Sequence, residues 1–354
     1  MPSRGPMSNP VEASMAPHVA HEGNPMPAQE RFLIIGALGC IGAWSVKRLL
    51  DDGTTVVSYD LPGDPHRLKL IMDDDEFAKV TFLTGDVTDQ VNLEAAVRDH
   101  GITHILHLAA IQVPSVRANP VLGSRINVVG TTIVLETAKR LADQVQSVAY
   151  ASSVAVYGPA SKYPTGPVAH EAPHLPTTLY GVNKVDNEWT GKIYWQDHQV
   201  RSIGVRPAFV YGPGRDVGMT STPTKAMLAA AAGREYAISF GGTGFYQHAE
   251  DVAKALIAGA RAEVDGAPVF NLGGSSMHMD DIVAAITAAA PESAGRITAA
   301  DTQLPFPDTY DGAPLDAAVG PVGYRDFVEG TRQTIERFRQ AITAGRLDVD
   351  RAIA

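Results

Sequence analysis

Short apolar runs alternate with amphipathic stretches along the chain from Arg31 onward. Each apolar run is rich in β-branched residues and ends at Gly, Pro, Asp or a small residue, which is typical of a buried strand. The runs predict strands at residues 31–36, 54–60, 80–86, 104–110, 147–153 and 201–207. The stretches between them predict helices at residues 41–53, 89–101 and 125–142 and a further helix after Tyr180.

These strands read as continuous apolar runs instead of alternating ones. Strands of this kind are covered on both faces, and strands that alternate with helices pair in parallel. We therefore expect an α/β fold, a Rossmann-type doubly wound parallel sheet, over residues 31–207. Loops rich in Gly, Pro and Thr separate shorter elements after Pro207. Residues 208–345 are expected to form mainly a smaller substrate-binding lobe, intertwined with the first and packed at the carboxyl ends of the strands.

Composition narrows the class of protein. The chain has 354 residues, 45% of them hydrophobic, and a net charge of −10. Because no long Lys/Arg run occurs, nucleic acid is not an expected partner. No apolar run reaches the roughly 18 residues that span a bilayer, so no membrane association is expected. The single cysteine, Cys40, rules out an internal disulfide and a cysteine-based metal site; no metal is expected, and a cytoplasmic setting fits.

Residues 1–30 are rich in Pro, Met, Ala and Ser, and they contain no apolar segment of the length that a signal peptide needs. We expect them to form a disordered tail.

A glycine-rich turn, "GALGCIG" at residues 36–42, joins the first predicted strand to the first predicted helix. Such a turn lets the backbone approach a pyrophosphate, and the helix N-terminus offers N–H groups to the anion. A tight turn needed only for packing is the alternative. Asp60 ends the second strand, where a carboxylate accepts hydrogen bonds from both ribose hydroxyls and repels a 2′-phosphate. The pattern favours NAD over NADP.

Tyr180 and Lys184 stand four residues apart, which places them on one face of the predicted helix. Taken alone, the pair is either ordinary helix surface or a device for proton transfer.

Eight pieces of the sequence, in this order, together resemble the extended short-chain dehydrogenase/reductase family, which includes nucleotide-sugar epimerases and dehydratases. They are "GALGCIG", Asp60, "GDV" at 85–87, "HLAA" at 107–110, Asn127, "ASSVAVYG" at 151–158, "YGVNK" at 180–184 and "RPAFVYGPG" at 206–214. The resemblance implies an NAD-dependent enzyme with Ser153, Tyr180 and Lys184 as its catalytic residues. The residues implied to bind NAD are Gly36, Gly39, Cys40, Ile41, Gly42, Asp60, Asp86, Val87, Leu108, Ala109, Ala110, Asn127, Tyr180, Lys184 and Pro207.

The resemblance also implies the acid/base chemistry. Tyr180 exchanges a proton with the substrate hydroxyl, and Ser153 holds the reacting oxygen. A free tyrosine has a pKa near 10. We expect the Lys184 ammonium and the positive nicotinamide to lower the pKa of Tyr180 toward neutrality.

The resemblance leaves three reactions open: net oxidation or reduction, epimerisation through a transient ketone, and dehydration. Members that dehydrate sugars carry an Asp-Glu pair where this chain has Val154 and Ala155. Members that bind nucleotide sugars have an Asn at the position of Phe209 and an Arg near the position of Gly244, and both contact the diphosphate. These departures favour an NAD-dependent oxidoreductase acting on a small carbohydrate-like substrate, such as a sugar, sugar acid or polyol.

A nucleotide-sugar 4-epimerase, similar to UDP-glucose 4-epimerase and with tightly bound NAD, is the alternative. A non-catalytic NAD-sensing regulator is disfavoured by the intact catalytic residues. The expected substrate contacts are Gln112, Ser115, Ser152, Phe209, Met219, Thr220 and Tyr246. By resemblance, we also expect a homodimer through a four-helix bundle, built from the helix after Asn127 and the helix that carries Tyr180.

Overall fold

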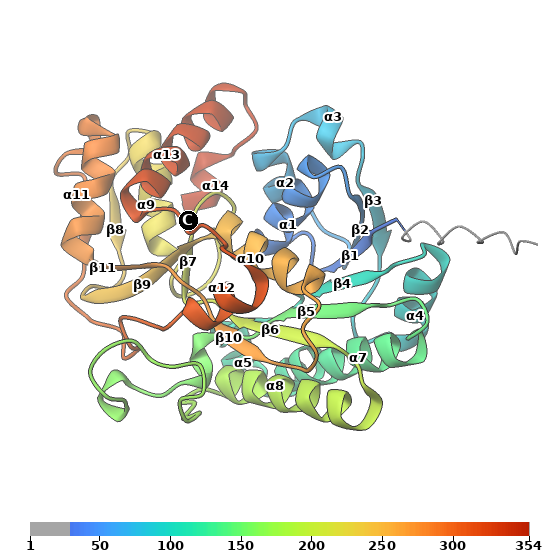
Figure 1. The fold of residues 1–354 in the computed structure, drawn as a ribbon. Helices are drawn as coiled ribbons and strands as arrows, with labels where there is room; N and C mark the ends of the chain where they lie inside the picture. The colour runs from blue at the N-terminus through green and yellow to red at the C-terminus, as the bar shows by residue number, and fades with distance from the viewer. Residues whose placement is uncertain (1–28, 354) are drawn as a thin grey trace, which may run out of the picture.

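The computed structural model describes residues 29–353, and its centre is a seven-stranded parallel sheet (Figure 1). The strand order is β10-β6-β5-β4-β1-β2-β3, so the chain reverses its direction of travel between β4 and β1. The strands are β1 (Arg31–Ile35), β2 (Thr55–Asp60), β3 (Thr81–Thr84), β4 (His104–His107), β5 (Ser147–Ala151), β6 (Ser202–Arg206) and β10 (Val269–Asn271). The doubly wound sheet expected from the sequence is confirmed.

Helices cover both faces of this sheet (Figure 1). One face carries α4 (Gln90–Asp99), α7 (Gly130–Arg140) and α8 (Leu179–His198), and the other carries α1 (Cys40–Asp51), α10 (Ala249–Arg261) and α12 (Ala313–Val319). Strand β1 shows why its sequence does not alternate. Phe32 and Ile34 join the core on the α1 side, whereas Leu33 and Ile35 join the core on the α4 side. Both sets are buried, so every position from Phe32 to Ile35 is apolar.

Short helices that the sequence pattern did not predict follow β2 and β4. They are α2 (His66–Ile71), α3 (Asp74–Phe77), α5 (Val113–Ala118) and α6 (Pro120–Ser124). They are too short to show a helical period, and only individual residues at their ends indicate them. Proline stands in the first turn of α5 and α6, and Asn119 caps α6 through Leu122 N. The helix expected at 125–142 begins instead with a π-helical turn, Arg125–Val129, before α7.

The smaller lobe is built from two minor sheets and the C-terminal helices (Figure 1). Its strands are β7 (Phe209–Tyr211), β9 (Thr243–His248) and β11 (Ser275–His278) in one sheet, and β8 (Tyr236–Ile238) and β12 (Ile297–Ala299) in the other. Its helices are α9 (Thr222–Ala231), α11 (Met279–Ala289), α13 (Phe327–Thr343) and α14 (Val349–Ile353). Between β9 and β11 the chain returns to the large sheet to add α10 and β10.

Glu30 forms an ion pair with Arg261 at 2.8 Å, so this last residue of the expected tail is held against α10. The rest of the tail, residues 1–28, lies outside the described residues. Within residues 29–353, no helix has the length and apolarity to cross a bilayer.

A buried ion pair joins α8 to β6. Arg206 donates from Nε to Glu188 Oε1 at 2.8 Å and from Nη2 to Glu188 Oε2 at 2.7 Å. The Glu188 and Arg206 side chains are 0% and 2% exposed. Ser152, at the end of β5, also donates to Glu188, and Tyr157 and the His170 carbonyl accept from Arg206. The network therefore fixes α8 against the carboxyl ends of β5 and β6.

Replacing Arg206 by Met should lower the free energy of unfolding by about 3–5 kcal/mol, because the Glu188 charge stays buried without its partner. Urea unfolding followed by circular dichroism measures the change. Arg201→Met is the matched control: its partner Asp265 is 80% exposed, and the pair is 3.4 Å apart. The control should change the free energy by no more than about 0.5 kcal/mol. Equal effects of the two substitutions would contradict a structural role for the buried pair.

Candidate active site

Glycine is required at two positions of the turn between β1 and α1. Gly36 has a φ of +90°, and a Cβ there would lie 2.6 Å from the backbone nitrogen of Ala109. A Cβ on Gly42 would lie 2.2 Å from the Gly36 carbonyl oxygen. Gly39 is the N-cap of α1 and brings no side chain to its N–H groups. The turn thus packs tightly against the end of β4 and leaves the helix N-terminus open to an anion.

A cleft opens where the strand order reverses, at the carboxyl ends of β4, β1 and β2. Eight of the residues expected to bind NAD line it: Gly36, Gly39, Asp60, Asp86, Val87, Leu108, Ala109 and Ala110. The Asp60 carboxylate accepts from the backbone N–H groups of Leu38 and Leu61, each at 2.8 Å. Burial raises the pKa of Asp60, and these two hydrogen bonds oppose the shift. The carboxylate is thereby held at the rim of the cleft.

Three other residues expected to bind NAD support the cleft and do not line it. The Asn127 side chain accepts from Ile111 N at 2.9 Å and donates to Ile111 O at 3.0 Å, which fixes the loop after β4. Gly42 allows α1 to pack closely against the Gly36 carbonyl. Burial raises the pKa of the Cys40 thiol to about 12, so the thiol stays neutral.

The three expected catalytic residues meet in a cavity of about 180 Å³ that adjoins this cleft. We call it the catalytic cavity. Ser153, Tyr180 and Lys184 line it, together with Ile41 and Pro207 from the expected NAD-binding set. Lys184 Nζ donates to the Ala151 carbonyl oxygen at 2.7 Å and lies 5.7 Å from the centre of the Tyr180 ring. The interpretation of the Tyr-Lys pair as ordinary helix surface is therefore wrong for Lys184, which is 4% exposed.

Local sequence explains how α8 reaches Ser153. Thr178 caps the helix by accepting from Gly181 N at 3.0 Å. A Cβ on Gly181 would lie 2.2 Å from the Ala155 carbonyl oxygen. Glycine after Tyr180 thus allows the first turn of α8 to pack directly on the segment that follows Ser153.

The protein chain alone does not lower the pKa of Tyr180, and the expectation that the nicotinamide charge lowers it stays a prediction. Burial raises the pKa of Tyr180 above its ordinary value, and this effect outweighs a hydrogen bond with Ser153 and the positive charge of Arg215. Burial also lowers the pKa of Lys184 to about 8, opposed by the Glu188 carboxylate. Desolvation is the larger effect at both groups, and its size could not be judged from the residue pattern.

Five of the seven expected substrate contacts line the catalytic cavity: Gln112, Ser152, Phe209, Met219 and Thr220. Two do not. Ser115 is exposed on α5. Tyr246 is 2% exposed and lies under Phe209, with ring centres 5.5 Å apart.

An aromatic cluster closes one side of the cavity. Phe209 meets Phe240, Tyr246 and Phe306 edge-on, with ring centres 5.9, 5.5 and 5.7 Å apart. A Cβ on Gly244 would lie 2.7 Å from the Phe209 ring, because the phenyl ring occupies the space beside Gly244. The two departures from the nucleotide-sugar pattern, Phe in place of Asn and Gly in place of Arg, are therefore linked. Phe306 also lines the cavity, and no motif near it in the sequence indicated this.

No carboxylate lines the catalytic cavity among the described residues. Its ionisable side chains are Tyr180, Lys184 and Arg215. Val154 and Ala155 stand at the cavity wall where sugar dehydration would need an acid and a base. The place of Arg215 beside Tyr180 was not predicted from the sequence.

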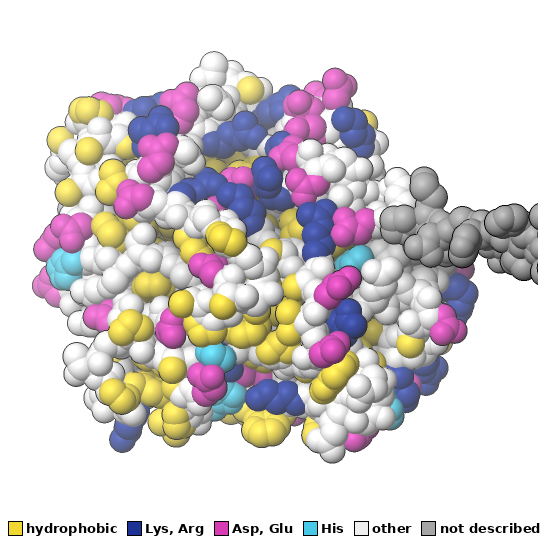
Figure 2. Space-filling model, viewed as in Figure 1, with side chains coloured by type: hydrophobic (Ala, Val, Ile, Leu, Met, Phe, Trp, Pro, Cys, Tyr) yellow, Lys and Arg dark blue, Asp and Glu magenta, His cyan; other side chains and the backbone are white. Residues whose placement is uncertain are grey.

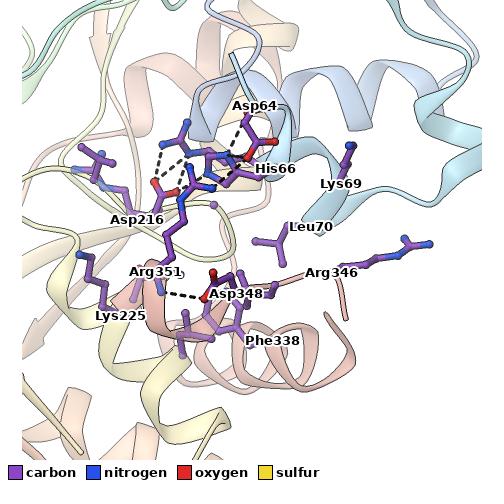
Figure 3. A pocket seen from close by; sticks show the side chains of 18 of the residues that line it. Asp64, His66, Lys69, Leu70, Asp216, Lys225, Phe338, Arg346, Asp348 and Arg351 are labelled. Carbon is purple, nitrogen blue, oxygen red and sulfur yellow. Dashed lines mark hydrogen bonds and ion pairs between the residues drawn. The ribbon is translucent and has the colours of Figure 1, made fainter. Parts of the chain in front are cut away.

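A larger cavity of about 710 Å³ lies on the other side of Arg67 and Asp216, between α2, α9 and α14. Figure 2 shows Lys and Arg side chains gathered there with Asp and Glu side chains among them. Asp216 forms ion pairs with Arg67 at 2.8 Å and with His66 at 2.9 Å. Figure 3 shows Asp216 and His66 on the same side of this cavity. Arg351 likewise has Asp64 as a partner at 3.4 Å.

Comparison with known proteins places this site in a family. The model of the NAD dependent epimerase/dehydratase family matches residues 32–273. UDP-glucose 4-epimerase of Mycolicibacterium smegmatis is 32% identical over 252 residues, which cover 69% of this chain and 77% of that protein. The chain belongs to the NAD-dependent epimerase/dehydratase family.

Other relatives differ in their named activity. D-erythronate dehydrogenase of Cupriavidus necator is 34% identical over 167 residues, which cover 44% of this chain and 48% of that protein. The solved structure of Thermus thermophilus UDP-glucose 4-epimerase in complex with NAD has a TM-score of 0.73 at 25% identity, covering 88% of this chain and 99% of that one. A monomeric L-threonine 3-dehydrogenase from a metagenome shares the fold, with a TM-score of 0.75 at 20% identity over 87% of this chain and 99% of its own.

The family's cofactor, NAD, fits the residues present. The open α1 N-terminus and the close-packed glycines suit its pyrophosphate, and the Asp60 carboxylate suits its adenosine ribose. When bound, NAD accepts or donates the hydride.

The buried Lys184 predicts a pH-dependent difference in stability. Its pKa is about 8 in the folded protein against a usual 10.5, so the unfolded chain binds more protons between these pH values. Below pH 8 the folded state carries a buried charge that costs roughly 3 kcal/mol. Lys184→Met should therefore be more stable than the wild type at pH 7, and the difference should shrink as the pH rises from 8 to 10. Urea unfolding across this range measures it, and a difference independent of pH would contradict the assignment.

Proposed function

We propose that this enzyme is an NAD-dependent oxidoreductase that acts on a hydroxyl or carbonyl carbon of a small carbohydrate-like compound. The observation that carries the proposal is the small cavity itself. Ser153, Tyr180 and Lys184 line it, no carboxylate does, and the Phe209 cluster closes it. Its volume of about 180 Å³ is below the roughly 300 Å³ at which pockets for drug-sized ligands begin.

Each catalytic side chain has one task in this proposal. Ser153 donates a hydrogen bond to the reacting oxygen and holds it against the Tyr180 hydroxyl. Tyr180 takes the proton from a substrate hydroxyl during oxidation and returns it during reduction. The Lys184 ammonium stabilises the phenolate through its charge, because it lies over the Tyr180 ring and is fixed by the Ala151 carbonyl.

The aromatic cluster supports a small substrate over a nucleotide sugar. A diphosphate needs cations or aligned N–H donors. Phe209 instead presents a phenyl ring that is 6% exposed and packed by Phe240 and Phe306. The likeness to D-erythronate dehydrogenase, a protein named for a small sugar acid, supports the same direction.

A nucleotide-sugar 4-epimerase is the second candidate. The likeness to UDP-glucose 4-epimerase covers more of the chain than the likeness to the dehydrogenase, and it favours this alternative. An epimerase regenerates its cofactor in each cycle, so the two candidates differ in whether NADH accumulates.

The test is to incubate the enzyme with excess NAD and follow NADH by absorbance. One pool holds free sugars, sugar acids and polyols, and the other holds UDP- and dTDP-sugars. We expect NADH with the first pool, and Tyr180→Phe should lower kcat by about 10²- to 10⁴-fold because the acid/base is lost. Tyr163→Phe is a matched control outside the cavity lining and should keep its activity. No NADH, with changed stereochemistry in the second pool, would establish the epimerase instead.

We also propose that the enzyme forms a homodimer through α7 and α8. Four apolar side chains on one face of α8 are exposed: Leu179, Val182, Trp189 and Ile193. Leu122 and Val129, on the neighbouring α6 and π-helical turn, are exposed as well. Contiguous exposed apolar surface of this kind is typical of a protein interface.

Trp189→Glu should convert a dimer at micromolar concentration into a monomer, because a charge is then placed within the apolar face. Sedimentation velocity measures the state. Val328→Glu, at an apolar residue of α13 that is 50% exposed, is the matched control and should remain dimeric. A monomeric wild type, like the monomeric L-threonine 3-dehydrogenase, would contradict the proposal.

A further inference from the structure

Arg215 lies at the wall of the catalytic cavity without a carboxylate partner among the described residues. Its Nη2 donates to Thr220 Oγ1 at 3.2 Å, and its Nε is buried with no acceptor. The loop that carries Arg215 approaches the Gln112 and Arg215 side chains closely. Gly218 has a φ of +107°, and a Cβ there would lie 2.1 Å from Gln112 Oε1 and 3.1 Å from Arg215 Nη2.

Other arginines near the two cavities are paired. Arg206 has Glu188 at 2.7 Å, and Arg67 has Asp216 at 2.8 Å. Burying a cation without an ion pair is costly, and burial lowers the pKa of Arg215. The charge of the neighbouring Asp216 opposes this shift, but Asp216 is already paired with Arg67. The missing anion is therefore expected to come from a ligand.

The position of Arg215 assigns that ligand to the substrate end of the site. It lines both the cavity that holds Tyr180 and the larger cavity, but the larger cavity already contains carboxylates, among them Asp216 and Asp348. The Arg215 charge also acts on the Tyr180 hydroxyl. Arg215 does not line the cleft formed by the glycine turn and Asp60. The other cation of the catalytic cavity, Lys184, already donates to the Ala151 carbonyl.

We propose that Arg215 binds the carboxylate of the substrate, and that the enzyme therefore acts on a short hydroxy acid in preference to a neutral sugar or polyol. The planar guanidinium presents paired N–H donors that match a carboxylate, and Nε is free to take part. No Asp or Glu lines the described catalytic cavity, so no carboxylate competes for Arg215 from within that cavity. The inference rests on the proposed function and narrows its substrate class.

The test compares matched probes on the NAD-loaded enzyme by calorimetry: threonate against threitol, and gluconate against glucitol. In the wild type, at least one aldonate should bind about 30-fold more tightly than its alditol, the range expected for hydrogen bonds to a charged group. Arg215→Met should remove the preference, and Arg215→Lys should keep part of it. Lys225→Met removes a cation that lines only the neighbouring larger cavity and should leave the preference intact.

Affinity for NAD is measured on the same variants, with circular dichroism to show that each is folded. Equal binding of aldonate and alditol by the wild type, no saturable aldonate binding, or a preference that persists in Arg215→Met would overturn the inference. A loss of NAD affinity by the same factor would also overturn it, because Arg215 would then serve the cofactor pyrophosphate. NADH formed from neutral compounds alone would leave the proposed function standing and this inference refuted. Aldonate binding through Arg215 without any NADH would leave this inference standing and refute the proposed function.

Discussion

The buried pair of Glu188 and Arg206 holds α8, the helix that carries Tyr180 and Lys184, in place. Tyr180, Lys184 and Glu188 follow one another at four-residue intervals, so they share one face of α8. Glu188 ties that face to β6 through Arg206 and to the end of β5 through Ser152. The residue after Ser152 is Ser153, so one charged network sets the distance between the serine and the tyrosine. Such a network is expensive to bury and brings rigidity in return.

The larger sheet follows from the sequence because its determinants are local. Continuous apolar runs require two covered faces, and Phe32 to Ile35 meet that requirement residue by residue. Gly36 and Gly42 are dictated by contacts with Ala109 and with each other, and both fall within the predicted turn. The positions of residues that lie in the strands or directly after a strand end could therefore be predicted from the sequence.

The substrate side was less predictable because its walls come from distant segments. Phe306 arrives from the loop after β12, and no local signal marks it. Tyr246 was expected at the surface of the site, but the ring of Phe209 covers it. In the protein chain alone, desolvation, a property of the whole fold, exceeds the effect of nearby charges on the pKa of Tyr180. Sequence patterns describe residues that are close along the chain, and they give little information about burial by segments that are distant in the sequence.

In the proposed function, the aromatic cluster limits the size of the substrate and Arg215 selects it by charge. Phe209 closes the space beside Gly244, and Arg215 leaves one positive charge unpaired within the remaining cavity. The most direct measurement is calorimetric titration of the NAD-loaded enzyme with UDP-glucose. We expect no saturable binding at millimolar concentration, because Phe209 stands where a diphosphate would need a donor. A micromolar dissociation constant would contradict it and would identify the site as one for nucleotide sugars.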